Sequence, residues 1–246
     1  MNRKKKIIVI ITIILILLLA MFFCYKMYLL NVYKIDKNKV SEYKQIQASI
    51  NINKNVTIDK KTYDGDYIEY QNLKVANIFN NYKLKEQNND NFEYGYVSYI
   101  NEKENGEIII RKESAVITDS KYESEYNSNS VLSIKCSDKK ILEKNNITND
   151  MELIKYFKNF EINSNTILTS KNKICENYYA YDNFTRMALG TVIPFNGNAE
   201  GYISMSDNNI TINVFGKDEV YILGFNNVKE VNIDVIYDLI SSIVME

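Results

Sequence analysis

The chain has 246 residues, of which 46% are hydrophobic, so it can build one folded domain with elaborations or two small ones and is not a disordered polar tail. Residues 1–26 hold five basic and no acidic residues, whereas residues 27–246 hold 25 basic and 31 acidic residues, a net charge of −6 without a basic cluster, which argues against nucleic-acid binding. Histidine is absent, which excludes Ser-His-Asp and Cys-His catalysis and ordinary zinc or non-haem iron sites in their usual forms.

The first predicted element is a transmembrane helix over residues 7–25. Every residue from Ile7 to Phe23 is apolar except Thr12, and the next two residues extend the run. At 1.5 Å per residue this helix is about 28 Å long, close to the roughly 30 Å thickness of a hydrocarbon core. Fourteen of its residues are Ile, Leu, Val or Phe, which favour insertion by about 4 to 8 kcal/mol in total. We therefore expect the segment to enter a membrane.

Cys24 raises the question of how this segment is processed. A cleaved signal peptide has a shorter apolar region followed by small residues. A lipoprotein signal has small residues directly before its cysteine, whereas Phe22 and Phe23 occupy those places here. We favour an uncleaved signal anchor, and lipidation at Cys24 or ordinary cleavage are the alternatives.

The basic residues before the helix predict its orientation. Residues 3–6 are all Arg or Lys, and such a segment stays on the cytoplasmic side under the positive-inside rule. Residues 1–6 are then a cytoplasmic tail, residues 26–48 a juxtamembrane connector, and residues 49–246 an extracytoplasmic domain. Asn, Ile, Lys and Tyr are used heavily, and because their codons are AT-rich we interpret the bias as that of an AT-rich bacterial genome. The expected location is the bacterial cytoplasmic membrane.

The first half of the extracytoplasmic domain is expected to be mostly strands. "NINKNVTID" and "GDYIEY" indicate short strands around a turn at Asp64 and Gly65. "NFEYGYVSYI" and "GEIIIRKESAVI" indicate two strands of a hairpin that turns through residues 101–105. The polar stretch from residue 118 to 129 is expected to be a loop.

Two helices are predicted next. In "NDMELIKYFKNF", Asn149 can cap a helix and Glu152 stands three residues later, the spacing of a capping box. A second helix is expected from about residue 170 to 189. Its apolar stripe comprises Ile174, Cys175, Tyr178, Tyr181 and Ala188. We expect the aromatic residues of "CENYYAYDNF" to pack in the core rather than form a platform for sugar or peptide.

The last part of the chain predicts an antiparallel meander and a closing helix. "GYISMS", "NITINVF" and "EVYILGF" are three strands separated by short turns. Ile210, Ile212 and Val214 alternate with polar residues, which predicts one solvent-exposed face. "NIDVIYDLISSIVME" has the apolar spacing of an amphipathic helix, which we expect to end the chain and cover the sheet.

This order of elements resembles PsbP-like α/β sandwich domains. The meander, its final strand "YILGF" and the "DLISSI" helix carry the resemblance. They are also similar to uncharacterised membrane-anchored proteins and lipoproteins of AT-rich Gram-positive bacteria. The resemblance covers residues 145–246, with a similar order of elements back to about residue 56. It implies an α+β fold in which helices cover an antiparallel sheet, with a binding or accessory role and no catalytic signature.

Two sets of residues are candidate sites. Asp64 and Asp66, with Glu69 nearby, form the best local group of carboxylates, the residue type that hydrolyses glycosides. They lack the spacing of a calcium-binding EF-hand loop, and we interpret them as solvated acids at a turn. Cys136 and Cys175 would close a loop of roughly 40 residues if they pair, which stabilises by about 4 kcal/mol. The sequence is compatible with a disulfide between them and with two separate buried thiols.

Together these features predict an extracytoplasmic binding or accessory domain with no catalytic residue, cofactor or metal. Its expected partners are the lipid bilayer, through residues 7–25, and an envelope protein as a candidate, with no nucleic acid. The alternatives are a cell-surface hydrolase that uses Asp64 and Asp66, and a purely structural envelope component. The oligomeric state stays open.

Overall fold

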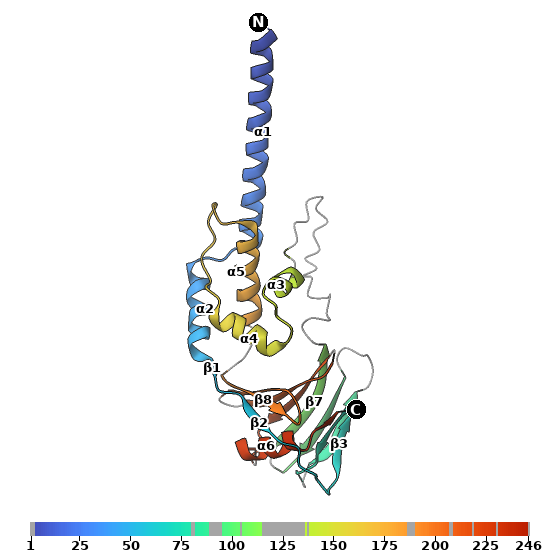
Figure 1. The fold of residues 1–246 in the computed structure, drawn as a ribbon. Coiled ribbons are helices and arrows are strands. Elements are labelled where there is room, and N and C mark those ends of the chain that lie inside the picture. Colours follow the sequence, from blue (N-terminus) through green and yellow to red (C-terminus); the bar gives the residue numbers. More distant parts are fainter. Residues whose placement is uncertain are drawn as a thin grey trace.

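The computed structural model has an α+β fold with one long N-terminal helix and a mostly antiparallel sheet accompanied by helices (Figure 1). It describes residues 3–79, 82–88, 95–103, 105–114, 136, 138–185, 190–206, 209–217, 219–229 and 231–245. The polar stretch 118–129, which was expected to be a loop, lies outside these residues.

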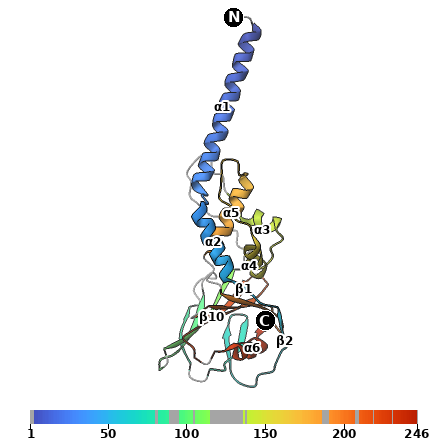
Figure 2. The same ribbon diagram turned by 90° about the vertical axis from the view of Figure 1, so that its left-hand side faces the viewer.

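Helix α1, Arg3–Val32, projects from the rest of the chain (Figures 1 and 2). It is longer than the predicted 7–25 segment, because the helix continues into the region expected to be a connector. Asp36 then caps helix α2, Lys37–Ser49, by accepting hydrogen bonds from the backbone N–H groups of Asn38 and Lys39 at 3.0 Å. We call the described residues from Lys37 to Met245 the body.

The main sheet has nine strands in the order β1-β8-β9-β10-β11-β7-β6-β5, and β2 also pairs with β8. Only β1 and β2 run parallel to their neighbour β8. The predicted hairpin β6–β7 and the predicted meander β9–β10–β11 are both confirmed. The pairing of β7 with β11 joins them, for example with Ile110 opposite Leu223. The strands are β1 Asn51–Ile52, β2 Val56–Ile58, β5 Lys83–Asn88, β6 Tyr96–Asn101, β7 Gly106–Ser114, β8 Thr191–Gly197, β9 Gly201–Ser206, β10 Asn209–Phe215 and β11 Glu219–Asn226.

A second, three-stranded sheet has the order β12-β4-β3, with β3 Tyr67–Tyr70, β4 Leu73–Ala76 and β12 Val244–Met245. The strands predicted on either side of Asp64 and Gly65 are present, but they belong to different sheets because β2 pairs with β8 and β3 with β4.

The closing helix is shorter than predicted. Helix α6, Ile233–Ser241, starts after the cap Asn232 and ends before β12. The Ser242 hydroxyl donates to the carbonyl of Leu239 at 2.7 Å and accepts from the N–H of Ala76 at 3.0 Å. Since Ser242 is tied to β4 in this way, the chain leaves the helix and its last residues pair as a strand.

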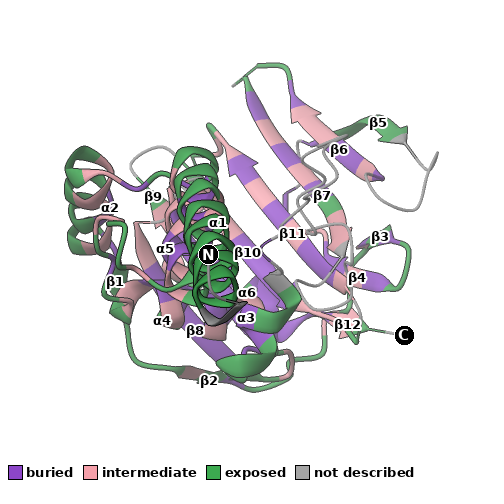
Figure 3. Ribbon diagram, turned by 90° about the horizontal axis from the view of Figure 1, so that it is seen from above, coloured by how far each residue is buried: buried purple, intermediate pink, exposed green. Residues whose placement is uncertain are grey.

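Helices lie on both faces of the main sheet at its β8–β10 side, so the polar face expected to be solvent-exposed on β10 is exposed at Asn209 but buried at Asn213. Helix α6 and the small sheet pack on one face with Ile212 and Val214. On the opposite face lies the helical layer, which we define as α2, α3 Asp138–Lys144, α4 Asp150–Asn159 and α5 Lys171–Phe184 (Figure 3). There Asn213, opposite Tyr202, is only 5% exposed. Asn213 is therefore buried on the face that carries the helical layer, whose helices come from distant parts of the sequence.

The two predicted helices of this layer form, with local differences. Asn149 caps α4 by accepting from the N–H of Glu152 at 3.0 Å. The Glu152 carboxylate reaches back to accept from the hydroxyl and N–H of Thr148, and a hydrogen bond from the backbone N–H of Asn149, the contact of a capping box, also acts on it.

Helix α5 buries Ile174 and Cys175 of the predicted stripe, but its other buried aromatic residues differ from those predicted. Tyr179 and Phe184 are buried, whereas Tyr178 and Tyr181 are partly exposed, and Ala188 lies outside the described residues. Phe184 packs against Tyr43 and Phe157 at ring-centroid distances of 5.0 and 5.4 Å, so contacts with α2 and α4 select the buried face.

Candidate functional site

The apolar run of α1 is exposed along its whole length. Each large apolar side chain from Ile7 to Phe23 is exposed, and the free Cys24 is exposed as well. Within the described part of the chain, α1 is the one helix long and apolar enough to cross a membrane. Contact of this apolar surface with water is unfavourable by about 25 cal/mol per Å².

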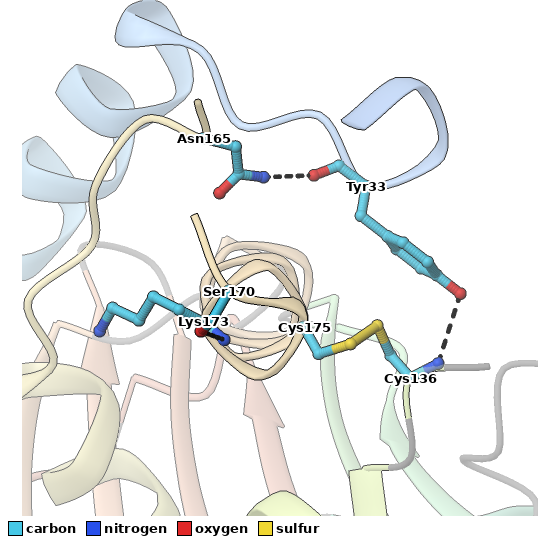
Figure 4. Close-up of a disulfide and its surroundings, with 6 residues drawn as sticks. All are labelled: Tyr33, Cys136, Asn165, Ser170, Lys173 and Cys175. Carbon is cyan, nitrogen blue, oxygen red and sulfur yellow. Dashed lines mark hydrogen bonds between the residues drawn. A yellow bond between two sulfur atoms is a disulfide. The ribbon is translucent and has the colours of Figure 1, made fainter. Parts of the chain in front are cut away.

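One side of the C-terminal end of the same helix is buried in the body. Leu29 is fully buried and Tyr33 is 5% exposed, both within the core of the helical layer. Asn165 holds this end in place, because its side-chain amide donates to the carbonyl of Tyr33 at 2.7 Å and its N–H to the carbonyl of Ile35 at 2.9 Å (Figure 4). The ammonium of Lys26 donates to the carbonyl of Thr169. Helix α1 therefore joins the body without a free linker.

A disulfide lies beside this junction (Figure 4). Cys136 and Cys175, the pair left open by the sequence, are bonded with a Cα–Cα distance of 5.3 Å, and both are buried. The N–H of Cys136 donates to the hydroxyl of Tyr33 at 3.5 Å. The disulfide thus connects α5 to the chain segment that contacts the end of α1.

The predicted acidic group lies at the surface. Asp64, Asp66 and Glu69 are all exposed, and the Glu69 carboxylate lies 3.4 Å from the ammonium of Lys74. Among the described residues no three His, Cys, Asp or Glu side chains are placed to hold a metal ion. These carboxylates are the solvated acids that the sequence pattern favoured.

Two hollows flank helix α4 and share Glu152 and Lys155 in their walls. The first, of about 520 Å³, lies beside the exposed face of α4, and the second, of about 320 Å³, lies between its first turn and the β1–β8–β9 edge. Side-chain amides and aromatic rings dominate both. The first is lined by Asn145, Asn146, Ile147, Tyr156, Asn159, Phe160 and Glu161, and the second by Ile52, Asn53, Asn55, Asn149, Met151, Pro194, Phe195, Asn196, Glu200, Gly201 and Phe215.

Glu152 is fixed as an anion between the two hollows. Hydrogen bonds from the hydroxyl and N–H of Thr148 lower the pKa of its carboxyl, and the nearby ammonium of Lys155 lowers it further. The residues around it offer amide donors and acceptors, a carboxylate and a cation beside aromatic rings. Such an arrangement suits a polar ligand that forms many hydrogen bonds.

Asp150 is a partly buried acid that sequence analysis missed. Burial raises the pKa of its carboxyl to about 6, and the carboxylate of Glu113 on β7 contributes. Its Oδ1 is buried without a hydrogen-bond partner among the described residues. In the sequence, an acid in the first turn of a helix indicates only a favourable position near the positive end of the helix dipole. Its burial against the sheet depends on the layer packing.

The fold and these sites define an α+β protein whose exposed apolar N-terminal helix ends inside a disulfide-linked helical layer. A scan against protein-family models and searches of curated proteins and of solved structures each found no match.

Proposed function

We propose that the chain is a single-pass membrane protein of the bacterial cytoplasmic membrane. Residues 7–25 are its uncleaved anchor, residues 1–6 remain in the cytoplasm, and the body lies outside. The contrast along α1 carries this proposal, because every large apolar side chain up to Phe23 is exposed while Leu29 and Tyr33 are buried in the body. A bilayer would cover the first part and the body covers the second. A buried disulfide also suits an oxidising exterior.

We further propose that the body is a binding or accessory domain for an envelope component. Two amide-rich hollows beside α4 support this role. The PsbP-like kinship of the body is part of the same proposal, and the meander followed by α6 on the sheet supports it. The anchor holds the body close to the membrane, since three residues separate α1 from the N-cap of α2.

The anchor proposal is tested by washing membranes that contain the full-length chain with alkaline carbonate. We expect the chain to stay in the pellet with Met1 or Asn2 as its N-terminus. A chain that begins at a lipidated Cys24, or one released by the wash, would contradict an uncleaved anchor.

The accessory role is tested by cross-linking in those membranes and purification of the chain with its partner. Lys155→Glu should abolish recovery of the partner, because this residue lines both hollows. Lys60→Glu is the matched control, since Lys60 is exposed and lines neither hollow. Equal recovery with both variants, or no partner with the wild-type chain, would count against the proposed role.

A further inference from the structure

A tight turn beside the end of α1 presents two apolar side chains to the solvent. Thr166 and Thr169 close this turn, because the N–H of Thr169 donates to the carbonyl of Thr166 at 3.0 Å and the N–H of Thr166 to the Thr169 hydroxyl at 2.8 Å. Between them stand Ile167, 37% exposed, and Leu168, 91% exposed. The central positions of tight turns favour Gly, Pro, Asn, Asp and Ser. Neither turn geometry nor core packing explains an isoleucine and a leucine here.

The turn is held rigidly against α1. The ammonium of Lys26, the first charged residue after the apolar run, donates to the carbonyl of Thr169. On the other side, the fully buried Asn177 of α5 donates to the carbonyl of Asn163 and to the side chain of Asn165, both at 2.9 Å. Asn165 in turn bonds the carbonyls of Tyr33 and Ile35, which directly follow α1. The position of the tip is therefore coupled to the position of the helix.

The tip lies where α1 changes from an exposed apolar surface to a buried one. In both side views the segment between α4 and α5 rises beside α1, on the side of the helical layer away from the sheet (Figures 1 and 2). Its bond to Lys26 sets its height one residue beyond the proposed span of residues 7–25. A bilayer surface crossed by α1 would meet the tip at this height.

We infer that Ile167 and Leu168 insert into the interface of the membrane that holds α1, as a second contact between the body and the lipid. This inference rests on the proposed anchor. Transfer of an exposed leucine side chain out of water is favourable, and the buried ammonium of Lys26, bonded to Thr169, adds no unpaired charge beside the tip. Two contacts, a helix and a turn, fix the tilt of the body on the membrane, which one helix alone does not.

Site-directed spin labelling of the full-length chain in phosphatidylcholine–phosphatidylglycerol vesicles tests this inference. In a Cys24→Ser background, single labels are placed at Leu168→Cys, at Leu18→Cys within α1, and at Leu84→Cys. Leu84 is the matched control, because it is a leucine that is 55% exposed on the edge strand β5. Collision rates with oxygen, which concentrates in lipid, and with a water-soluble nickel chelate report the depth of each label.

The ratio of oxygen to nickel collisions at position 168 should be severalfold higher than at position 84 and lower than at position 18. A ratio at position 168 equal to that at position 84, with position 18 in lipid, would overturn the inference and leave the anchor intact. Protection from both reagents at position 168 would also overturn it, since it indicates burial by protein. An aqueous ratio at position 18 would overturn the anchor and the inference together.

Discussion

Two acids in the first turn of α4 are treated in opposite ways by their surroundings. Asp150 lies at the sheet, where burial raises the pKa of its carboxyl to about 6. Glu152 lies at the surface, where hydrogen bonds from Thr148 lower the pKa of its carboxyl. Two carboxylic acids near the same helix terminus therefore differ: the surroundings favour the protonated form of Asp150 and the ionised form of Glu152. Only the ionisation of Asp150 lowers the stability of the fold at neutral pH.

Replacement of Asp150 by Asn should stabilise the protein above pH 6. Because the folded-state pKa of about 6 lies above the ordinary value of 3.8, the folded state binds the proton more tightly. The free energy of unfolding therefore falls as pH rises from about 4 to about 6 and stays lower above that. We expect Asp150→Asn to raise it by about 1–2 kcal/mol at pH 7.5 and to leave it nearly unchanged at pH 4, where the carboxyl is already protonated in the folded state.

Urea unfolding of the chain in detergent at both pH values measures this difference. Asp59→Asn, at an exposed position, controls for loss of an acid. An equal effect of Asp150→Asn at both pH values would contradict the assignment of a raised pKa to this carboxyl.

At the scale of elements, locally signalled features were predictable and tertiary ones were not. The side chain of Asn149 caps the first turn of α4, and residues 101–105 connect two strands that are adjacent in the sequence. Both features therefore depend on residues close together in the sequence, which a local pattern can reveal. The end of α6 depends on a bond between Ser242 and Ala76, and the orientation of α5 on contacts with α2 and α4. Periodicity within one segment carries no information about partners more than 100 residues away.

One such distant contact should have a measurable effect on the helical layer. The side-chain amide of Gln47 on α2 donates to the carbonyls of Phe157 and Phe160 at 2.8 and 2.9 Å at the end of α4. The Phe157 carbonyl also accepts from the Tyr43 hydroxyl at 2.7 Å. We expect Gln47→Ala to lower the free energy of unfolding by about 1–2 kcal/mol. Gln45→Ala, on the exposed side of α2, should change it by less than about 0.5 kcal/mol. If urea unfolding shows a similar decrease in the free energy of unfolding for both variants, the decrease comes from the change in helix propensity and not from the lost hydrogen bonds of Gln47.

At the scale of the whole molecule, the fold class followed from the order of patterns, whereas the layers and the site required the structure. The meander and the β6–β7 hairpin were visible as alternation, but their union through β7 and β11 joins segments about 100 residues apart. The hollows beside α4 combine residues from α4, β1, β8 and β9, none of which is a motif on its own. Cys136 and Cys175 were recognised as a pair, yet their contact depends on the packing of α5.

The continuity of α1 with the helical layer gives the molecule its proposed arrangement. The body follows the helix with Leu29 and Tyr33 in its core, so a membrane that holds residues 7–25 also positions the hollows beside α4 at a fixed distance from its surface. The basic residues 3–6 suit the cytoplasmic side of that membrane.

Labelling of intact cells with a membrane-impermeant maleimide tests this arrangement most directly. In a Cys24→Ser background, Lys60→Cys places a thiol on the exposed surface of the body, and Asn2→Cys places one in the proposed cytoplasmic tail. The account predicts that Lys60→Cys is labelled in intact cells, that Asn2→Cys is labelled only after lysis, and that both thiols are on a chain of full-length mass. Labelling of Asn2→Cys in intact cells, or a Lys60→Cys chain shortened by loss of residues 1–23, would contradict it.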